Sequence, residues 1–293
     1  MVADPIANFS YATDEDPKVR RMLIRAIESM SGQPYLKSLY DEHRANPIPG
    51  ESFWAAAIRM LELKVVWNHE ALAHLPRTGP LAVVANHPFG VLDGLVISYL
   101  ISHLRNDFVV LTNSVLYQAQ EIRPHLLPVD FSETKEALET NLKSRAAAKA
   151  HLMKGGCLVV FPAGGASTAP KPWSRQAIDA EWKTLTARLI VAAKAPVAPI
   201  YFAGQNSRLF QIASHISMTL RLSLFFKEVY DKIGSEIHVR IGEVIPYKEL
   251  EALDRKELME HLRKATYALG AEVPQRKIRG RKPTRARRAR PIS

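Results

Sequence analysis

The chain has 293 residues, with 40 lysines and arginines against 29 aspartates and glutamates, which gives a formal charge of +11 at neutral pH. The surplus lies at one end, because residues 276–290 hold nine basic side chains and no acidic one. Removing these nine from +11 leaves +2 for residues 1–275. A nearly neutral body excludes a globular domain built around a basic nucleic-acid-binding face.

Composition and hydropathy narrow the class further. Hydrophobic residues make up 47% of the chain, so a full core can form. The single cysteine, Cys157, excludes an internal disulfide framework and fits a reducing compartment. The first residues are acidic and lack the basic start and apolar run of a secretory signal. No segment has the roughly 18–20 apolar residues of a spanning helix, so we expect a cytoplasmic protein, peripheral on the cytoplasmic membrane face.

The predicted elements begin with helices and continue as an alternation. Residues 17–66 have helical character, and 53–67 forms an amphipathic helix with Phe53, Ile58 and Leu61 on one stripe. From about residue 80, short apolar runs alternate with amphipathic segments. The expected strands are 81–86, 108–112, 125–130, 157–165, 196–204 and 237–245, and the expected helices are 93–104, 114–120, 132–153, 176–194, 207–229 and 249–269.

This alternation predicts an α/β fold. We expect a mixed, mostly parallel sheet of about six or seven strands, flanked by helices on both sides. The predicted organisation is an N-terminal helical segment (1–66), an α/β domain (67–270) and a basic disordered tail (275–293).

Asn86-His87 stands at the end of a predicted buried strand, and Asp93 follows six positions after His87. Ligands of α/β folds bind at the carboxyl ends of strands. A turn through Pro88 and Gly90 can bring the Asp93 carboxylate to one imidazole nitrogen. That contact fixes the tautomer and leaves the other nitrogen as a general base. The spacing by itself leaves an alternative, in which His87 has a structural role and no part in catalysis.

A second turn, Phe161-Pro162-Ala163-Gly164-Gly165-Ala166-Ser167, also follows a predicted buried strand. Its adjacent glycines expose backbone N–H groups, which suit an oxyanion or a phosphate.

Together these segments resemble the glycerolipid acyltransferase family, also called the lysophospholipid acyltransferases, of which the 1-acylglycerol-3-phosphate acyltransferases are members. The first family motif is Asn-His followed by an Asp, and the third is Phe-Pro-Glu-Gly-x-x-Ser. The fourth is a proline-containing apolar strand, here residues 195–200. All three occur in family order, and the resemblance covers about residues 65–265.

The resemblance implies a reaction and roles for named residues. His87 would deprotonate the acceptor hydroxyl, and Asp93 would orient His87 and stabilise its charged form. The acceptor, a lysophospholipid or related lyso-lipid, would attack the thioester of an acyl-CoA or acyl carrier protein, with no metal, no further cofactor and no covalent acyl-enzyme. The residues expected on the substrate side are Asn86, Gly164, Gly165 and Ser167.

The sequence departs from the family pattern at three places. Five residues separate His87 from Asp93, one more than usual, and the pattern matches a branch with Asn-His-Pro. Ala163 replaces the Glu of the third motif, which is linked to a glycerol-phosphate acceptor. The second motif, at best residues 128–131, lacks its usual Arg. Plain lysophosphatidate is therefore a doubtful acceptor, and an aminoacyl lyso-lipid such as lyso-ornithine lipid is an alternative.

Basic residues near predicted strand ends are candidates to hold an anionic head group. Arg123 and Arg208 are the preferred two, and each could equally be a solvated surface charge. The other candidates are Lys135, Lys171 and Arg175.

Several alternatives stay open or are excluded. A thioesterase or hydrolase would use the same His–Asp pair with water as acceptor, and a non-catalytic lipid-binding protein is the alternative outside enzymes. His69 and His74 are five residues apart and do not share a helix face, so no metalloprotease site is expected. We expect contact with an anionic membrane through 276–290, while 207–229 is either a core helix or a second membrane contact. Nucleic acid is an unlikely partner.

Overall fold

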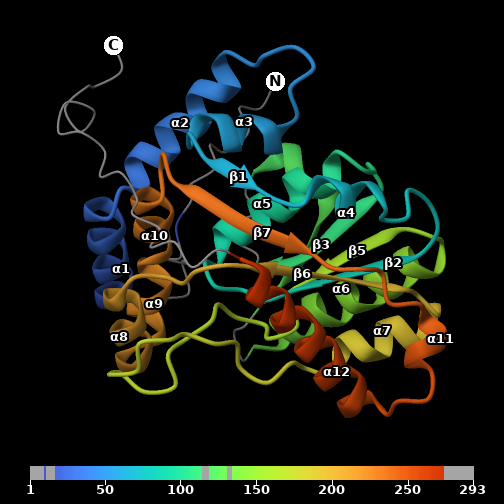
Figure 1. Ribbon diagram of the computed structural model, residues 1–293. Helices are drawn as coiled ribbons and strands as arrows, with labels where there is room; N and C mark the ends of the chain where they lie inside the picture. Colours follow the sequence, from blue (N-terminus) through green and yellow to red (C-terminus); the bar gives the residue numbers. More distant parts are fainter. Residues whose placement is uncertain (1–9, 11–16, 114–118, 131–133, 274–293) are drawn as a thin grey trace.

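The computed structural model describes residue 10 and residues 17–113, 119–130 and 134–273. Within these residues, seven strands form one sheet in the order β1-β7-β6-β2-β5-β3-β4 (Figure 1). Neighbouring strands are parallel except β6 and β7, which are antiparallel. The predicted mixed, mostly parallel α/β sheet is therefore confirmed. The strands are β1 (Lys64–Val66), β2 (Leu81–Ala85), β3 (Phe108–Asn113), β4 (Leu126–Val129), β5 (Cys157–Val160), β6 (Val197–Phe202) and β7 (Glu236–Ile241).

The central strands are apolar on both sides because helices cover both faces of the sheet. Every residue of β2 and β5 is buried. Leu81, Val83 and Ala85 contribute to one core cluster, whereas Ala82 and Val84 contribute to the other. Successive residues of a strand point to opposite faces, so a strand between two helical layers becomes a continuous apolar run.

Two layers of helices cover these faces. The first core cluster includes residues of α2 (Gln33–Ala45), α3 (Phe53–Met60), α4 (His69–Ala73) and α5 (Val91–Ser102). The second includes residues of α6 (Lys135–Met153), α7 (Leu185–Ala193) and α12 (Arg255–Ala268), with α11 (Tyr247–Leu250) beside them. Two short 3₁₀ turns, η2 (Gln120–His125) and η3 (Leu269–Glu272), complete this part of the fold.

A third group of helices stands at one end of the sheet. It comprises α1 (Lys18–Met30), α8 (Arg208–Ile216), α9 (Met218–Ser223) and α10 (Phe225–Asp231), which lie together at the left of Figure 1. They share a separate small core that includes Ile24, Phe210 and Phe226. Because α8 follows β6, this group lies at the carboxyl ends of the parallel strands.

Four predicted helices are wrong in extent. The one expected over 249–269 begins only at Arg255, after the N-cap Asp254, and its first residues belong to the separate helix α11. The helix expected over 53–67 ends at Met60, Glu62 adopts a left-handed φ of 50°, and 64–66 is the edge strand β1. The first half of the helix expected over 176–194 is extended, with Ile178 bridged to Thr168. The helix expected over 207–229 is divided into α8, α9 and α10. For 64–66 and for Ile178, a strand partner elsewhere in the chain outweighs local periodicity.

Ser217 explains the division between α8 and α9. Its backbone is extended (φ −159°, ψ 134°), and its side chain accepts a hydrogen bond from Thr219 N. Serine caps helices in this way and competes with the helical hydrogen-bond ladder.

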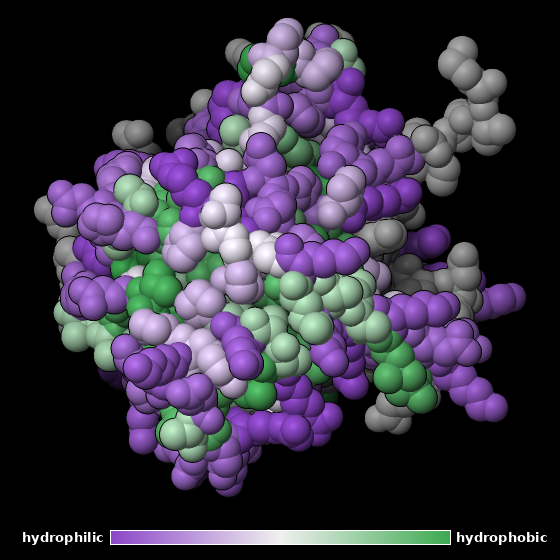
Figure 2. Space-filling model, turned by 90° about the vertical axis from the view of Figure 1, so that its right-hand side faces the viewer, coloured by the Kyte–Doolittle hydropathy of each residue, from purple (hydrophilic) through white to green (hydrophobic). Residues whose placement is uncertain are grey.

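Some of the predicted segments lie outside the residues that the structure describes. The helix expected at 114–120 lies mostly outside the described residues, as does the tail expected at 275–293. No helix among the described residues is long and apolar enough to cross a membrane. The face seen in Figure 2, on the side of α7 and α11, is mainly hydrophilic, with hydrophobic residues showing between the charged ones.

Candidate active site

The turn between β2 and α5 brings His87 and Asp93 together. Gly90 has a φ of 76° and a ψ of −118°, a conformation that side chains rarely adopt, and α5 begins at the next residue. Asp93 Oδ2 accepts hydrogen bonds from the backbone N–H groups of Phe89 (2.8 Å) and Gly90 (2.9 Å). The extra residue between His87 and Asp93 is thus absorbed where glycine permits a sharp reversal.

The imidazole of His87 is held by its partner and by a ring contact. Its Nδ1 lies 3.0 Å from Asp93 Oδ2, and its side chain is 17% exposed whereas that of Asp93 is fully buried. The ring stacks on Phe161, with centroids 4.1 Å apart and planes 25° apart. Nδ1 is therefore the ring nitrogen beside the carboxylate, at ion-pair distance but outside hydrogen-bond geometry, and Nε2 is the nitrogen left to act as a base.

Burial governs the electrostatics of this pair. It raises the pKa of Asp93 above its usual range, against the smaller lowering effects of His87 and of the two backbone N–H donors. Behind the turn, the ammonium of Lys232 lies 4.6 Å from the ring centroid of Phe89 and 3.7 Å from Glu228. Burial lowers the pKa of Lys232, and the nearby carboxylates, Asp93 among them, oppose this.

The second predicted turn lies directly against the first. Ser167 N donates to His87 O at 2.7 Å, which joins the two motifs through their backbones. Gly164 has a φ of 73°, and its N–H donates back to Phe161 O at 3.0 Å. The N–H of Gly165 has no acceptor within the described part of the chain.

Asp179 is a buried carboxylate that connects the two motif turns, and the sequence analysis missed it. Its carboxylate accepts hydrogen bonds from Ser167 Oγ (2.5 Å), from the backbone N–H of His87 (3.2 Å) and from Trp182 Nε1 (2.9 Å). The sequence analysis predicts a helix over 176–194, whereas the described α7 begins only at Leu185. Ser167 was predicted on the substrate side, but its hydroxyl donates to Asp179 inside the protein.

Asn86 connects the site to the neighbouring strand. Its Nδ2 donates to Phe202 O (2.9 Å), and its Oδ1 accepts from Phe202 N (2.7 Å). Asn68, after β1, makes the same paired contact with Ile241 of β7 at 2.8 and 2.9 Å. Both asparagines extend the sheet where a strand ends, and this geometry gives the side chain of Asn86 a structural task.

The predicted basic residues are not gathered at His87. Arg208 donates to the carbonyls of Pro172 (3.1 Å) and Ser174, so it holds the loop that contains Lys171 and Arg175. Lys135 is exposed at the start of α6. Arg123 lies in η2, before β4, and therefore at the amino ends of the parallel strands, opposite to His87.

Two basic residues that were not predicted flank the glycine turn. Arg221 Nη2 donates to Ala166 O at 2.6 Å, and Lys183 Nζ would be 3.0 Å from a Cβ built on Gly164. The sequence signal for Arg221 is its charge within the otherwise apolar segment 207–229.

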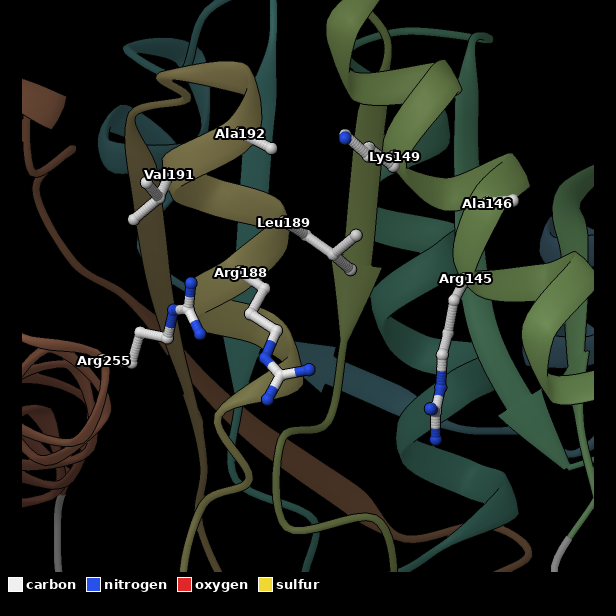
Figure 3. A pocket seen from close by; sticks show the side chains of 8 residues that line it. All are labelled: Arg145, Ala146, Lys149, Arg188, Leu189, Val191, Ala192 and Arg255. Carbon is white, nitrogen blue, oxygen red and sulfur yellow. The ribbon is translucent and has the colours of Figure 1, made fainter.

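A separate basic pocket lies on the outer side of α6 and α7 (Figure 3), with a volume of about 430 Å³. Neither His87 nor Asp93 contributes to it, and the two motif turns are absent from its lining, so it is distinct from the candidate site. Its lining residues are Arg145, Ala146, Lys149, Arg188, Leu189, Val191, Ala192 and Arg255.

Comparison with known proteins adds three findings. A family model described as "Acyltransferase" matches residues 21–274. Lyso-glycine lipid O-acyltransferase of Bacteroides thetaiotaomicron is 25% identical over 231 residues, covering 74% of this chain and 81% of the relative. The protein of the same name from Phocaeicola vulgatus is 26% identical over 212 residues, covering 69% and 71%.

Among solved structures, the 1-acyl-sn-glycerophosphate (LPA) acyltransferase PlsC of Thermotoga maritima is similar to this chain. The TM-score is 0.49 at 15% sequence identity, with 89% of this chain and 99% of that chain covered.

Replacing Gly90 by Ala tests the turn. The new Cβ would lie 2.3 Å from a ring carbon of Phe225, and the positive φ adds strain, so we expect a loss of unfolding free energy above roughly 1 kcal/mol. Urea denaturation measures it. Gly79→Ala also places a Cβ at a positive φ (81°) but has no neighbour within 4 Å, and Gly94→Ala in α5 has room for the methyl group. Equal losses at Gly90 and Gly79 would refute the contact with Phe225.

Replacing Asn86 by Ala tests its structural task. Two backbone groups of Phe202 lose their partner, and each buried group left unpaired costs about 1–3 kcal/mol. The matched variant is Asn68→Ala, which breaks the same contact away from His87. We expect similar losses in urea denaturation, with a further loss of activity only in Asn86→Ala, because His87 follows it directly. An Asn86→Ala protein of unchanged stability would show that the side chain has another role.

Proposed function

This chain belongs to the acyltransferase family whose model matches residues 21–274, and from that membership we propose that it transfers a fatty acyl group from a thioester to a hydroxyl of a lyso-lipid. The observation that carries the proposal is the pair formed by His87 and the buried Asp93, 3.0 Å apart, beside a glycine turn. A positioned base next to an anion-binding turn is what acyl transfer to a hydroxyl requires.

In this proposal, His87 acts as the general base. Because Nδ1 is the nitrogen next to Asp93, Nε2 is the one that takes the proton of the acceptor hydroxyl as the oxygen attacks. The carboxylate stabilises the imidazolium that forms. The stacking of the ring on Phe161 restricts its orientation, and the 17% exposure of the side chain leaves an approach for substrate.

The bonds and the proton balance without another reagent. The acceptor oxygen forms a bond to the thioester carbonyl carbon, and a tetrahedral oxyanion results. When this collapses, the carbon–sulfur bond breaks, and the proton held by His87 passes to the leaving thiolate. The products are an ester and a free thiol. The N–H of Gly165 supports the binding of negative charge beside His87, either on the oxyanion or on the acceptor.

For the acceptor, we favour a lyso-lipid with an amino-acid head group. Two relatives carry the name lyso-glycine lipid O-acyltransferase. Ala163 stands where the family pattern has a glutamate linked to glycerol-phosphate acceptors, which supports an acceptor other than lysophosphatidate. Acyl-CoA and acyl carrier protein both present the required thioester, and an assay with each donor separates them.

We also propose that the enzyme binds membranes through an apolar face on α1, α8 and α9. The outer side of α8 exposes Leu209, Ile212 and Ile216, and α9 exposes Met218. On α1, which packs on α9, Val19 and Met22 are exposed as well. These helices lie at the carboxyl ends of the strands, on the same side as His87. A lyso-lipid in a membrane would be within their reach, and the basic segment 276–290 would add attraction to anionic lipid.

Substituting His87 tests the chemistry. We expect His87→Ala to lower the rate of lyso-lipid acylation by roughly 10²–10⁴ in a protein that still folds. Some fall in the thermal midpoint is also expected, because the ring stacks on Phe161 and lies against the buried Asp93. Asp93→Asn should also slow transfer, since the imidazolium loses its carboxylate. The matched control is His74→Ala, at an exposed histidine.

The products decide between transfer and hydrolysis. Purified protein is incubated with a labelled acyl-CoA or acyl carrier protein thioester and a panel of lyso-lipids, and the products are identified by mass. If free fatty acid forms and no acylated lipid is found, the enzyme is a hydrolase and acyl transfer is refuted. Full activity in His87→Ala would refute the general base, and turnover with neither donor would refute the enzymatic proposal.

Vesicle co-sedimentation tests the membrane contact. The double substitution Ile212→Gln/Ile216→Gln should weaken binding to phosphatidylglycerol vesicles by at least tenfold, because burying one such side chain contributes about 1.5–3 kcal/mol. The matched control is Leu138→Gln/Leu142→Gln on α6, whose leucines are equally exposed. Removal of 275–293 should reduce the salt-sensitive part of binding. Unchanged binding in the α8 variant would exclude this face.

A further inference from the structure

Arg221 is a partly buried cation at the edge of the candidate site. It lies in α9, and its Nη2 donates to Ala166 O at 2.6 Å. The same nitrogen would be 3.5 Å from a Cβ built on Gly165, so the guanidinium rests against the glycine turn. Its CZ also lies 5.8 Å from the ring centroid of Phe210.

The charge of Arg221 is not compensated within the described residues. No carboxylate there forms an ion pair with it, and its one hydrogen-bond acceptor is the Ala166 carbonyl. Burial lowers the pKa of Arg221 from its usual value. Buried charges are ordinarily paired, because desolvation without a partner is costly. An Arg in this setting has donors left for an anion that comes from outside the chain.

A second cation approaches the same turn. Lys183 is exposed, and its ammonium lies beside Gly164. No acidic partner is found for it among the described residues, and the N–H of Gly165, the next residue of the turn, has no acceptor there either. Two cations without an acidic partner therefore contact adjacent residues of one turn, Lys183 at Gly164 and Arg221 at Gly165, and the turn also has an N–H without an acceptor. These are the kinds of donor that bind an anion.

This cluster adjoins the proposed base. Ala166, which Arg221 contacts, precedes Ser167, whose N–H donates to His87 O at 2.7 Å. An anion bound at the turn would thus belong to a molecule whose other groups can reach His87.

We propose that Arg221, assisted by Lys183 and the N–H of Gly165, binds the anionic group of the acceptor, a carboxylate or a phosphate, and so selects anionic lyso-lipids. The proposal rests on the acyl-transfer function argued above. Ala163 is consistent with it, because a glutamate in this turn would place a negative charge close to both cations and compete with the acceptor.

The test compares acceptors that differ only in charge. One pair is an N-(β-hydroxyacyl)glycine and its methyl ester, and the other is lysophosphatidate and the neutral monoacylglycerol. The wild-type enzyme should prefer the charged member of at least one pair in KM, by about tenfold or more. The pair with the larger preference identifies the anion. Arg221→Gln should abolish the preference with a smaller change in kcat, and Arg221→Lys should retain part of it.

Two further variants guard against a misleading result. Lys183→Gln alters an exposed side chain, should leave the fold intact, and should reduce the preference severalfold even where Arg221→Gln is unstable. The matched control for loss of charge is Arg77→Gln, an exposed arginine before β2 at the amino ends of the strands. It should leave the preference unchanged.

The outcomes separate this inference from the proposed function. If the wild-type enzyme acylates lyso-lipids but Arg221→Gln and Lys183→Gln keep the full preference for the charged acceptor, the subsite is refuted and acyl transfer stands. If these variants raise KM for acyl-CoA but not for the acyl-pantetheine thioester, the cations bind the donor's phosphates, and the inference is also refuted. If the wild-type enzyme transfers nothing, acyl transfer itself fails. The subsite then depends on whether His87→Ala binds the N-(β-hydroxyacyl)glycine more tightly than its methyl ester in calorimetry.

Discussion

The fully buried carboxylate of Asp93 is the constraint on which the site depends. A carboxylate without solvent needs donors, and Asp93 Oδ2 accepts from the N–H groups of Phe89 and Gly90, with His87 Nδ1 3.0 Å away. Its Oδ1 has no hydrogen-bond partner among the described residues. These contacts require the reversal at Gly90, and the reversal requires α5 to begin there. The position of the imidazole is therefore a consequence of solvating one buried charge with protein groups.

The second turn is joined to the first by a small number of polar contacts. Ser167 N reaches His87 O, and the carboxylate of Asp179 binds the hydroxyl of Ser167 and the N–H of His87. Two segments that are far apart in the sequence thus form one rigid unit. The same unit presents Gly165 toward Arg221, so the proposed base and the proposed anion subsite are held in register by the same hydrogen bonds.

The central strands and helices were predictable because burial shows directly in the pattern of apolar residues along each segment. Strands such as β2 and β5 are buried on both faces and are continuous apolar runs, and α5 and α6 have the expected places. The edge strand β1 was not predictable, since three residues after a helix show no periodicity of their own and are held by β7, far along the chain. Asp179 was missed for a related reason, because the extended segment around it is held by Thr168 rather than by local preference.

By itself, the sequence determined the α/β class, the His87–Asp93 pair and the glycine turn, because each is a short-range pattern of residue types with a direct chemical meaning. Membership of the acyltransferase family agrees with that pattern. Only the tertiary structure decided that Asn86 and Ser167 are occupied by internal contacts, that Arg123 lies at the opposite edge of the sheet, and that Arg221 and Lys183 meet at the turn. These are contacts between residues distant in the chain, and packing, not local sequence, brings such residues together.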